Sequence, residues 1–317
     1  MRRFAALLLL ALATPAAAEF PDKPIRLIVP QAPGSATDTV ARILAPEMSK
    51  PLGQPVIVEN RPGGALTIGI DAVAKAAPDG YTIGLGPVGA LAITRHMVGK
   101  LPYDIERDLQ PVALVGYSYM LLAVSPKLPV TSVVELIDYA KKNPGKLFNA
   151  SSSNGSPGHV SGELFKVMTG TQITHVPYKG GAAAIGDLIS GNVQLMFEST
   201  NSISPHVKAG RVRGLAVSGA KRSIAFPELP TLAEAGVPGY EVSSWSGIIA
   251  PAGLAPAVLD RLNAAANATL QAPEVKERLL QLGNEGGGGT PEQFGELIRR
   301  DSAKWAEVIR LSGARID

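Results

Sequence analysis

The 317-residue chain contains no cysteine. This absence excludes disulfide bonds, thiolate metal sites and cysteine nucleophiles. Aromatic residues make up only 5% of the chain, which argues against a stacking surface for single-stranded nucleic acid. Charged residues are also few, at 18%, whereas 45% of the residues are hydrophobic. A chain of this composition can bury a large core and does not have the signature of a disordered protein.

No uninterrupted apolar run is long enough to span a membrane, and a notable shorter one lies near the N-terminus. Arg2 and Arg3 precede ten apolar residues, 4–13, and the alanines at 16–18 form a small-residue cleavage site. This arrangement is typical of a secretory signal peptide, and the run is shorter than the roughly 18 apolar residues that span a membrane. We therefore expect residues 1–18 to be a cleaved signal peptide and the mature protein to be soluble in the periplasm. Without a cysteine at the cleavage site, it is not expected to be a lipoprotein.

A strong net charge is absent once the leader is set aside. Removal of its two arginines leaves 28 Lys and Arg against 27 Asp and Glu, a net charge of +1. A nucleic-acid partner therefore has no electrostatic support, and none is expected. The four histidines show no H-E-x-x-H spacing, which leaves a metalloenzyme unsupported without excluding it, and no metal or cofactor is predicted. His159 and Glu163 lie four residues apart, and a helix-stabilising pair is the favoured interpretation of that spacing.

The motifs of common enzyme classes are either missing or misplaced. A serine hydrolase of the α/β class needs G-x-S-x-G at a strand-to-helix turn, and no such pentapeptide occurs. Residues 84–89 match G-x-G-x-x-G, but they follow the third predicted strand rather than the first, which disfavours a dinucleotide site. We expect the protein not to be an enzyme. A secreted periplasmic hydrolase acting on a small ester or amide is the alternative.

Apolar runs of strand length alternate with segments of helical period, which is the signature of an α/β fold built from βαβ units. In a first series, strands are predicted at 25–29, 56–58 and 81–85, and helices at 36–50 and 65–76. In a second series, helices at 132–143, 157–168, 182–190 and 203–209 alternate with strands at 147–150, 173–176, 193–197 and 212–217. Three further helices are predicted at 256–271, 273–282 and 291–311.

Two domains are expected, since a domain usually has roughly 100–200 residues. The segment 109–124 is nearly all apolar, but Pro111 and Gly116 interrupt it. It is too broken for one helix and too long for one strand, so we interpret it as a crossing between domains. The chain is expected to return near 242–249. Domain 1 then comprises 19–122 plus 246–317, with the C-terminal helices, and domain 2 comprises 123–245, both of them α/β.

Three small, hydroxyl-rich loops open predicted helices, at 32–38, 151–156 and 176–181. The N-terminus of a helix presents unpaired N–H groups and the positive end of the helix dipole. Two such ends facing each other across a cleft, one from each domain, could bind a carboxylate without arginine. Capping of the helices alone explains these loops equally well. The residues by themselves leave both interpretations open.

At these loops the sequence resembles a known family. The matching segments include APGSATDTVAR (32–42), VIVENRPGG (56–64), NGSPGHVSGELF (154–165), HVPYKGG (175–181) and PTLAEAG (230–236). With shorter matches between them, they cover nearly the whole chain after residue 18, in order. They resemble the Bug family of periplasmic solute-binding proteins, which are the receptors of tripartite tricarboxylate transporters.

The resemblance implies a two-domain periplasmic binding protein fold, with a ligand cleft between the domains and a small organic acid as the ligand. It also implies membrane transporter subunits encoded elsewhere, while the receptor itself is expected to be a monomer. Citrate-like acids, C4 to C6 dicarboxylates, acidic amino acids and aromatic acids all stay open as ligands. The ligand-binding residues that the resemblance implies are Ala32, Ser35, Thr37, Asp38, Gly86, Val88 and Ala90 in domain 1, and Ser152, Ser156, His159 and Tyr178 in domain 2.

Some of these residues have a second interpretation. Ser35 stands where many relatives have a glycine, and its hydroxyl could donate directly to the ligand. For Asp38, a structural role in a capping box that begins at Ser35 is favoured over contact with the ligand. His159 is similarly expected to order the second loop. Lys179, the only cationic residue of the three loops, is expected to lie at the rim of the cleft.

Overall fold

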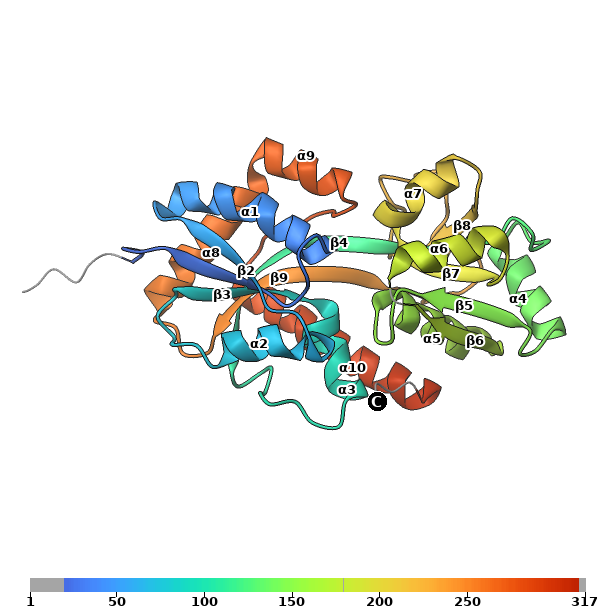
Figure 1. The fold of residues 1–317 in the computed structure, drawn as a ribbon, viewed down its shortest axis with the longest axis horizontal. Helices are drawn as coiled ribbons and strands as arrows, with labels where there is room; N and C mark the ends of the chain where they lie inside the picture. Colours follow the sequence, from blue (N-terminus) through green and yellow to red (C-terminus); the bar gives the residue numbers. More distant parts are fainter. Residues whose placement is uncertain (1–19, 179, 314–317) are drawn as a thin grey trace, which may run out of the picture.

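The computed structural model describes residues 20–178 and 180–313 (Figure 1). The predicted signal peptide, 1–18, and Lys179 lie outside the described residues. In the described part of the chain, no helix combines the length and the apolar character that a membrane crossing requires. The chain folds into two α/β halves that share two long strands (Figure 1).

The first half confirms the predicted alternation of strands and helices. Helix α1 runs two residues past its predicted end, because Gly53 rather than Pro51 terminates it. Gly53 has a φ of 73°, in the left-handed region, and its N–H bonds to the carbonyl of Ser49. The elements are β1 (Ile25–Val29), α1 (Ala36–Leu52), β2 (Val56–Asn60), a short turn η1 (Gly64–Leu66), α2 (Thr67–Ala74), β3 (Thr82–Pro87), a π turn η2 (Gly89–Ile93) and α3 (Thr94–Met97).

The second half also confirms the alternation. Its strands β6, β5 and β7 lie side by side in that order and are parallel. Strand β7 begins and ends two residues later than predicted, so Glu198 and Ser199 belong to its carboxyl end. The elements are α4 (Val133–Lys142), β5 (Leu147–Ser151), α5 (Pro157–Thr169), β6 (Ile173–Pro177), α6 (Gly181–Ser190), β7 (Leu195–Ser199), α7 (Thr200–Lys208) and β8 (Arg213–Val217).

Strand β4 (Leu109–Val124) joins the two halves. The prediction that this segment is too long for one strand is wrong, because it forms a single strand of 16 residues. Residues 109–119 pair with β9 (Ser243–Pro251), and residues 120–124 pair with β7. The register with β9 shifts next to Pro111 and next to Gly116, so these residues are absorbed as local irregularities. The segment still passes from one half to the other.

The strands form one hydrogen-bonded series, in the order β2-β1-β3-β9-β4-β7-β5-β6, with β8 also paired to β4. Strand β9 lies antiparallel between β3 and β4. The sheet of the first half is therefore completed only by the part of the chain that returns from the second half.

Two of the three C-terminal helices, α8 (Pro256–Gln271) and α9 (Pro273–Gln281), pack against α1 in the first half. Helix α10 (Pro291–Ser312) begins with the predicted capping box of Thr290 and Gln293. It packs against η2 of the first half but also against β4 and against α5 of the second half. Helix α10 is predicted to belong to domain 1, and in the structure its contacts extend to both halves.

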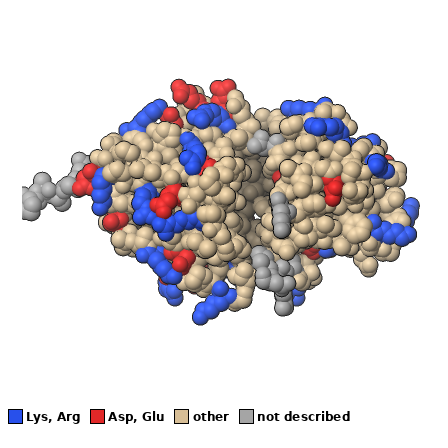
Figure 2. Space-filling view, viewed as in Figure 1, with Lys and Arg blue, Asp and Glu red and all other residues tan. Residues whose placement is uncertain are grey.

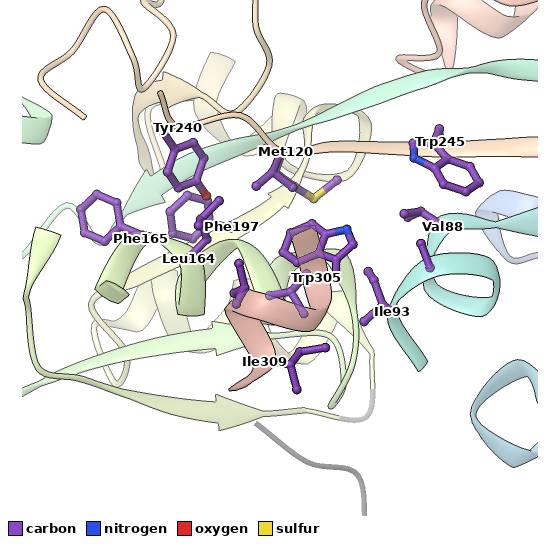
Figure 3. Close-up of a cluster of buried hydrophobic side chains, with 14 of the residues drawn as sticks. Val88, Ile93, Met120, Leu164, Phe165, Phe197, Tyr240, Trp245, Trp305 and Ile309 are labelled. Carbon is purple, nitrogen blue, oxygen red and sulfur yellow. The ribbon is translucent and has the colours of Figure 1, made fainter. Parts of the chain in front are cut away.

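A buried apolar cluster contains side chains of α10 and of both halves. In Figure 3, Trp305 of α10 lies between Phe197 of β7 on one side and Val88 and Ile93 on the other. The indole Nε1 of Trp245 in β9 donates a hydrogen bond to Asp301 Oδ2 of α10, at 2.6 Å. These contacts connect the last helix to both halves, and the exact domain boundaries stay a prediction.

Candidate functional site

A cavity of about 370 Å³ opens between the two halves, and Figure 2 shows the crevice between the two lobes. Its walls come from the segments that follow β1, β2, β3, β5 and β7, together with residues of β4, β7 and β9. Serine and threonine hydroxyls make up most of its polar groups. The lining residues are Gln31, Ala36, Thr37, Ala65, Leu66, Pro87, Val88, Gly89 and Thr94 from the first half, Ser118, Met120 and Ser244 from the crossing strands, and 152–158, 197–199 and Ser202 from the second half.

Helix α1 directs its N-terminus at the cavity. Ser35 is the N-cap, and its hydroxyl accepts a hydrogen bond from the backbone N–H of Asp38 at 3.2 Å. Thr37, in the first turn, lines the cavity, and no hydrogen bond joins its hydroxyl to another described residue. The Thr37 hydroxyl and the first N–H groups of α1 are therefore available to a ligand.

Asp38 holds the loop that precedes α1. Its side chain is buried, and its carboxylate accepts from the Gly34 N–H at 2.8 Å, from Arg42 Nε at 2.9 Å and from Asn60 Nδ2 at 2.9 Å. Burial raises the pKa of Asp38, but the hydrogen bonds from Arg42, Gly34 and Asn60 outweigh burial and lower it below its ordinary value. The carboxylate thus orders the loop instead of lining the cavity. It bonds to the N–H of Gly34 rather than that of Ser35, so the capping box is incomplete.

Helix α5 directs its N-terminus at the cavity from the second half. Ser156 is its N-cap and accepts from the N–H of His159 at 3.3 Å. Nδ1 of His159 accepts in turn from the N–H of Gly155 at 3.0 Å. His159 is buried and does not line the cavity, so it orders the loop, in agreement with the favoured interpretation.

A second histidine supports the same loop. The ring of His175 in β6 stacks on that of His159, with 3.7 Å between ring centroids, and its Nε2 lies 2.7 Å from Ser151 Oγ. Burial, the neighbouring His175 and Lys166 lower the pKa of His159 to about 3. Burial and Lys166 lower the pKa of His175 to about 4. Both rings are therefore neutral at neutral pH.

The predicted pair of His159 and Glu163 is loose, with 3.8 Å between Nε2 and Oε1. Lys166 Nζ lies closer to the Glu163 carboxylate, at 2.7 Å from Oε2. Since the neutral His159 ring contributes little charge, Lys166 is the ionic partner of Glu163 on this helix.

Four of the predicted site residues line the cavity: Thr37, Val88, Ser152 and Ser156. The others lie outside its lining, for identifiable reasons. The Tyr178 hydroxyl donates to Asp187 Oδ2 at 2.6 Å, which turns the ring toward α6. Gly86 faces the core, where an added Cβ would lie 2.6 Å from the side chain of Leu91. The other predicted residues that do not line the cavity are Ala32, Ser35, Asp38, Ala90 and His159.

Sequence reasoning missed several lining residues. Ser118 and Ser244 lie in the crossing strands, where nothing in the local pattern distinguishes them. Glu198 and Ser199 follow the last apolar residue of β7, and an acidic residue directly after a buried strand was a signal that could have identified them. Among the described lining residues, Glu198 alone has an ionisable side chain. In the described part of the chain, no group of three His, Asp or Glu side chains is placed to hold a metal ion.

Known proteins resemble this chain over almost its full length. The model of a family described as "Tripartite tricarboxylate transporter family receptor" matches residues 40–313. BugT of Bordetella pertussis is 38% identical over 307 residues, which cover 96% of this chain and 94% of that protein. The structure of R. palustris Rpa4515 with adipate has a TM-score of 0.83 and 39% identity, and covers 94% of this chain and 100% of that one. The structure of MatC (Rpa3494) from Rhodopseudomonas palustris with bound malate has a TM-score of 0.77 and 31% identity. It covers 92% of this chain and 100% of that one.

These similarities agree with the two α/β halves and the cavity between them. They support a receptor and give no support to the hydrolase alternative. The family model and the full-length relatives confirm the resemblance to the Bug proteins: the chain belongs to the tripartite tricarboxylate transporter receptor family.

Proposed function

We propose that this protein is a periplasmic receptor that captures a small organic carboxylate in the cleft and delivers it to membrane transporter subunits. The observation that carries the proposal is the convergence of two helix N-termini, α1 and α5, on one hydroxyl-lined cavity. The similar structures of Rpa4515 with adipate and of MatC with malate support a carboxylate as the ligand.

Recognition then depends on backbone N–H groups and hydroxyls. The positive ends of the α1 and α5 dipoles favour an anion, and hydrogen bonds to a carboxylate are stronger than those to a neutral acceptor. Thr37 and Ser156 donate to the ligand from opposite walls, and Ser152 and Val88 complete the contact. Asp38 and His159 act as positioning residues that fix the two loops.

Strands β4 and β9 act as the hinge of this receptor, because they are the strands that cross between the halves. A small change in their twist brings the two loop walls together around the ligand. Closure excludes water, which strengthens each hydrogen bond to the carboxylate. Export with cleavage after Ala18, a monomeric state and partner subunits in the membrane belong to the same proposal.

A thermal-shift screen over a carboxylate library tests this function. A true ligand at 100 times its dissociation constant adds about 2.7 kcal/mol to the free energy of unfolding and raises the melting temperature accordingly. Diols with the same carbon skeletons are the controls and should have no effect. The acid must be recovered unchanged. Turnover of an ester or amide, or a library without any stabilising acid, would contradict the proposal.

A further inference from the structure

Among the described residues that line the cleft, Glu198 is the one with an ionisable side chain, and a negative charge is unexpected in a site that takes an anion. Glu198 lines the cavity at the end of β7, and every other described lining residue is neutral. An unpaired carboxylate beside a bound dicarboxylate would place like charges together in a partly desolvated space, which is unfavourable. A cationic group on the ligand would remove this repulsion.

The surroundings of Glu198 leave one of its oxygens for such a partner. Oε1 accepts from the N–H and the hydroxyl of Ser199, at 2.9 and 3.2 Å. No hydrogen bond or ion pair joins Oε2 to another described residue. Oε2 lies beside the backbone of Gly181, where an added Cβ would be only 3.0 Å away. Within the described part of the chain, the carboxylate is thus held at one oxygen and has no hydrogen-bond partner at the other.

No described basic side chain neutralises Glu198. On α5, Lys166 is committed to Glu163, at 2.7 Å. On α7, Lys208 lies over the ring of Phe226, 5.9 Å from its centroid. Burial raises the pKa of Glu198, and the hydrogen bonds from Ser199 only partly offset burial. This direction is the one expected of a buried carboxylate that has no cationic partner among the described residues.

A second acceptor lines the same cavity from the opposite wall. The side-chain Oε1 of Gln31, which follows β1, is buried and accepts no hydrogen bond from the described residues. The cleft therefore offers acceptors as well as the N–H and hydroxyl donors at the helix N-termini. A plain dicarboxylate has no donor with which to satisfy those acceptors.

We propose that Glu198 accepts hydrogen bonds from the ammonium group of the ligand, so that the receptor selects amino carboxylates over the same acids without an amine. The inference rests on the proposed carboxylate-binding function. The ligand carboxylate lies at the N-termini of α1 and α5, and its ammonium lies against Oε2 of Glu198. The ligand then supplies a negative charge for the helix N-termini and a positive charge for Glu198.

Isothermal titration at neutral pH tests this with matched pairs of acids: aspartate and succinate, glutamate and glutarate, 2-aminoadipate and adipate. In the wild-type protein, the amino acid of at least one pair should bind about tenfold or more tightly than its partner, the scale of a charge-assisted hydrogen bond. Glu198→Gln, which keeps the shape and removes the charge, should abolish that preference. It should leave the affinity for the acid without the amine unchanged or higher.

Glu198→Asp and Glu228→Gln are the companion variants. Glu198→Asp keeps the charge and should keep part of the preference, even if Glu198→Gln folds poorly. Glu228 is exposed on the surface, so Glu228→Gln makes the same change in net charge and should alter nothing. Tighter binding of the plain acid by the wild-type protein, or the same ratio in Glu198→Gln, would overturn this inference and leave the receptor function intact. If no acid of either series and no acid of the library binds, both this inference and the proposed receptor function are wrong.

Discussion

Thr37 and Ser156, at the N-termini of α1 and α5, supply the hydroxyl groups that donate hydrogen bonds to the ligand in the proposed site. Removing one of them leaves part of a bound carboxylate without its partner, so Ser156→Ala and Thr37→Ala should each weaken binding by about 1–3 kcal/mol. Isothermal titration with the acid found in the screen measures this loss.

Ser156 is also an N-cap, and its loss should lower the free energy of unfolding by about 1 kcal/mol. Ser132→Ala is the matched control, because Ser132 caps α4 and does not line the cavity. It should lose similar stability and no affinity. Equal loss of affinity in Ser132→Ala would show that capping, and not contact with the ligand, explains the effect of Ser156.

The stacked histidines make stability depend on pH. Their pKa values in the folded protein are about 3 and about 4, well below the ordinary value of 6.5. Between pH 6.5 and 4 the unfolded chain therefore binds more protons than the folded one, and the free energy of unfolding falls as the pH falls. The slope approaches about 1.4 kcal/mol per pH unit for each histidine.

Urea unfolding at pH 7, 6 and 5 checks this dependence. His159→Gln and His175→Gln should each reduce the slope, whatever they do to stability at pH 7. If both variants show the same slope as the wild-type protein, the pH dependence does not come from these two histidines.

At the scale of elements, periodicity predicted most of the structure because each strand-helix unit buries its own apolar face. Strand β4 could not be predicted in the same way. Pro111 and Gly116 break its local pattern, and only the register shifts against β9, more than a hundred residues away in the sequence, accommodate them. Glu198 was not predicted as a residue of the cleft for a related reason. The predicted end of β7 was two residues early, and it is the position at the strand end that brings Glu198 to the cleft.

Gly116 in β4 lies so close to a segment distant in the sequence that a side chain there would not fit. An added Cβ would lie 2.6 Å from the carbonyl oxygen of Gly286, in the segment between α9 and α10. Gly116→Ala should therefore lower the free energy of unfolding by about 1–3 kcal/mol, as overpacking does. Gly186→Ala in α6 is the control, since nothing lies within 4 Å of its added Cβ. It should raise stability by roughly 0.5–1 kcal/mol. Denaturant unfolding compares the two, and a harmless Gly116→Ala would contradict the close packing.

At the scale of the whole molecule, β4 and α10 link the halves so extensively that neither half has a complete core without them. We expect calorimetry to show a single transition, with equal calorimetric and van't Hoff enthalpies, and not two separate domain transitions. A ligand should shift that one peak as a unit. Two resolved peaks, with only one of them sensitive to the ligand, would show that the shared strand and helix contribute less than their contacts indicate.

The position of β9 between β3 and β4 also has a consequence for the order in which the protein is made. Synthesis proceeds from the N-terminus, yet the strand that lies between β3 and β4 is the last strand in the described part of the chain. Until residue 251 has been synthesised, β3 and β4 each present an open edge, and open edges invite pairing with other chains. The nascent chain is therefore most prone to aggregation late in synthesis, and a chaperone that shields strand edges should matter more for this protein than for one whose sheet closes in sequence order.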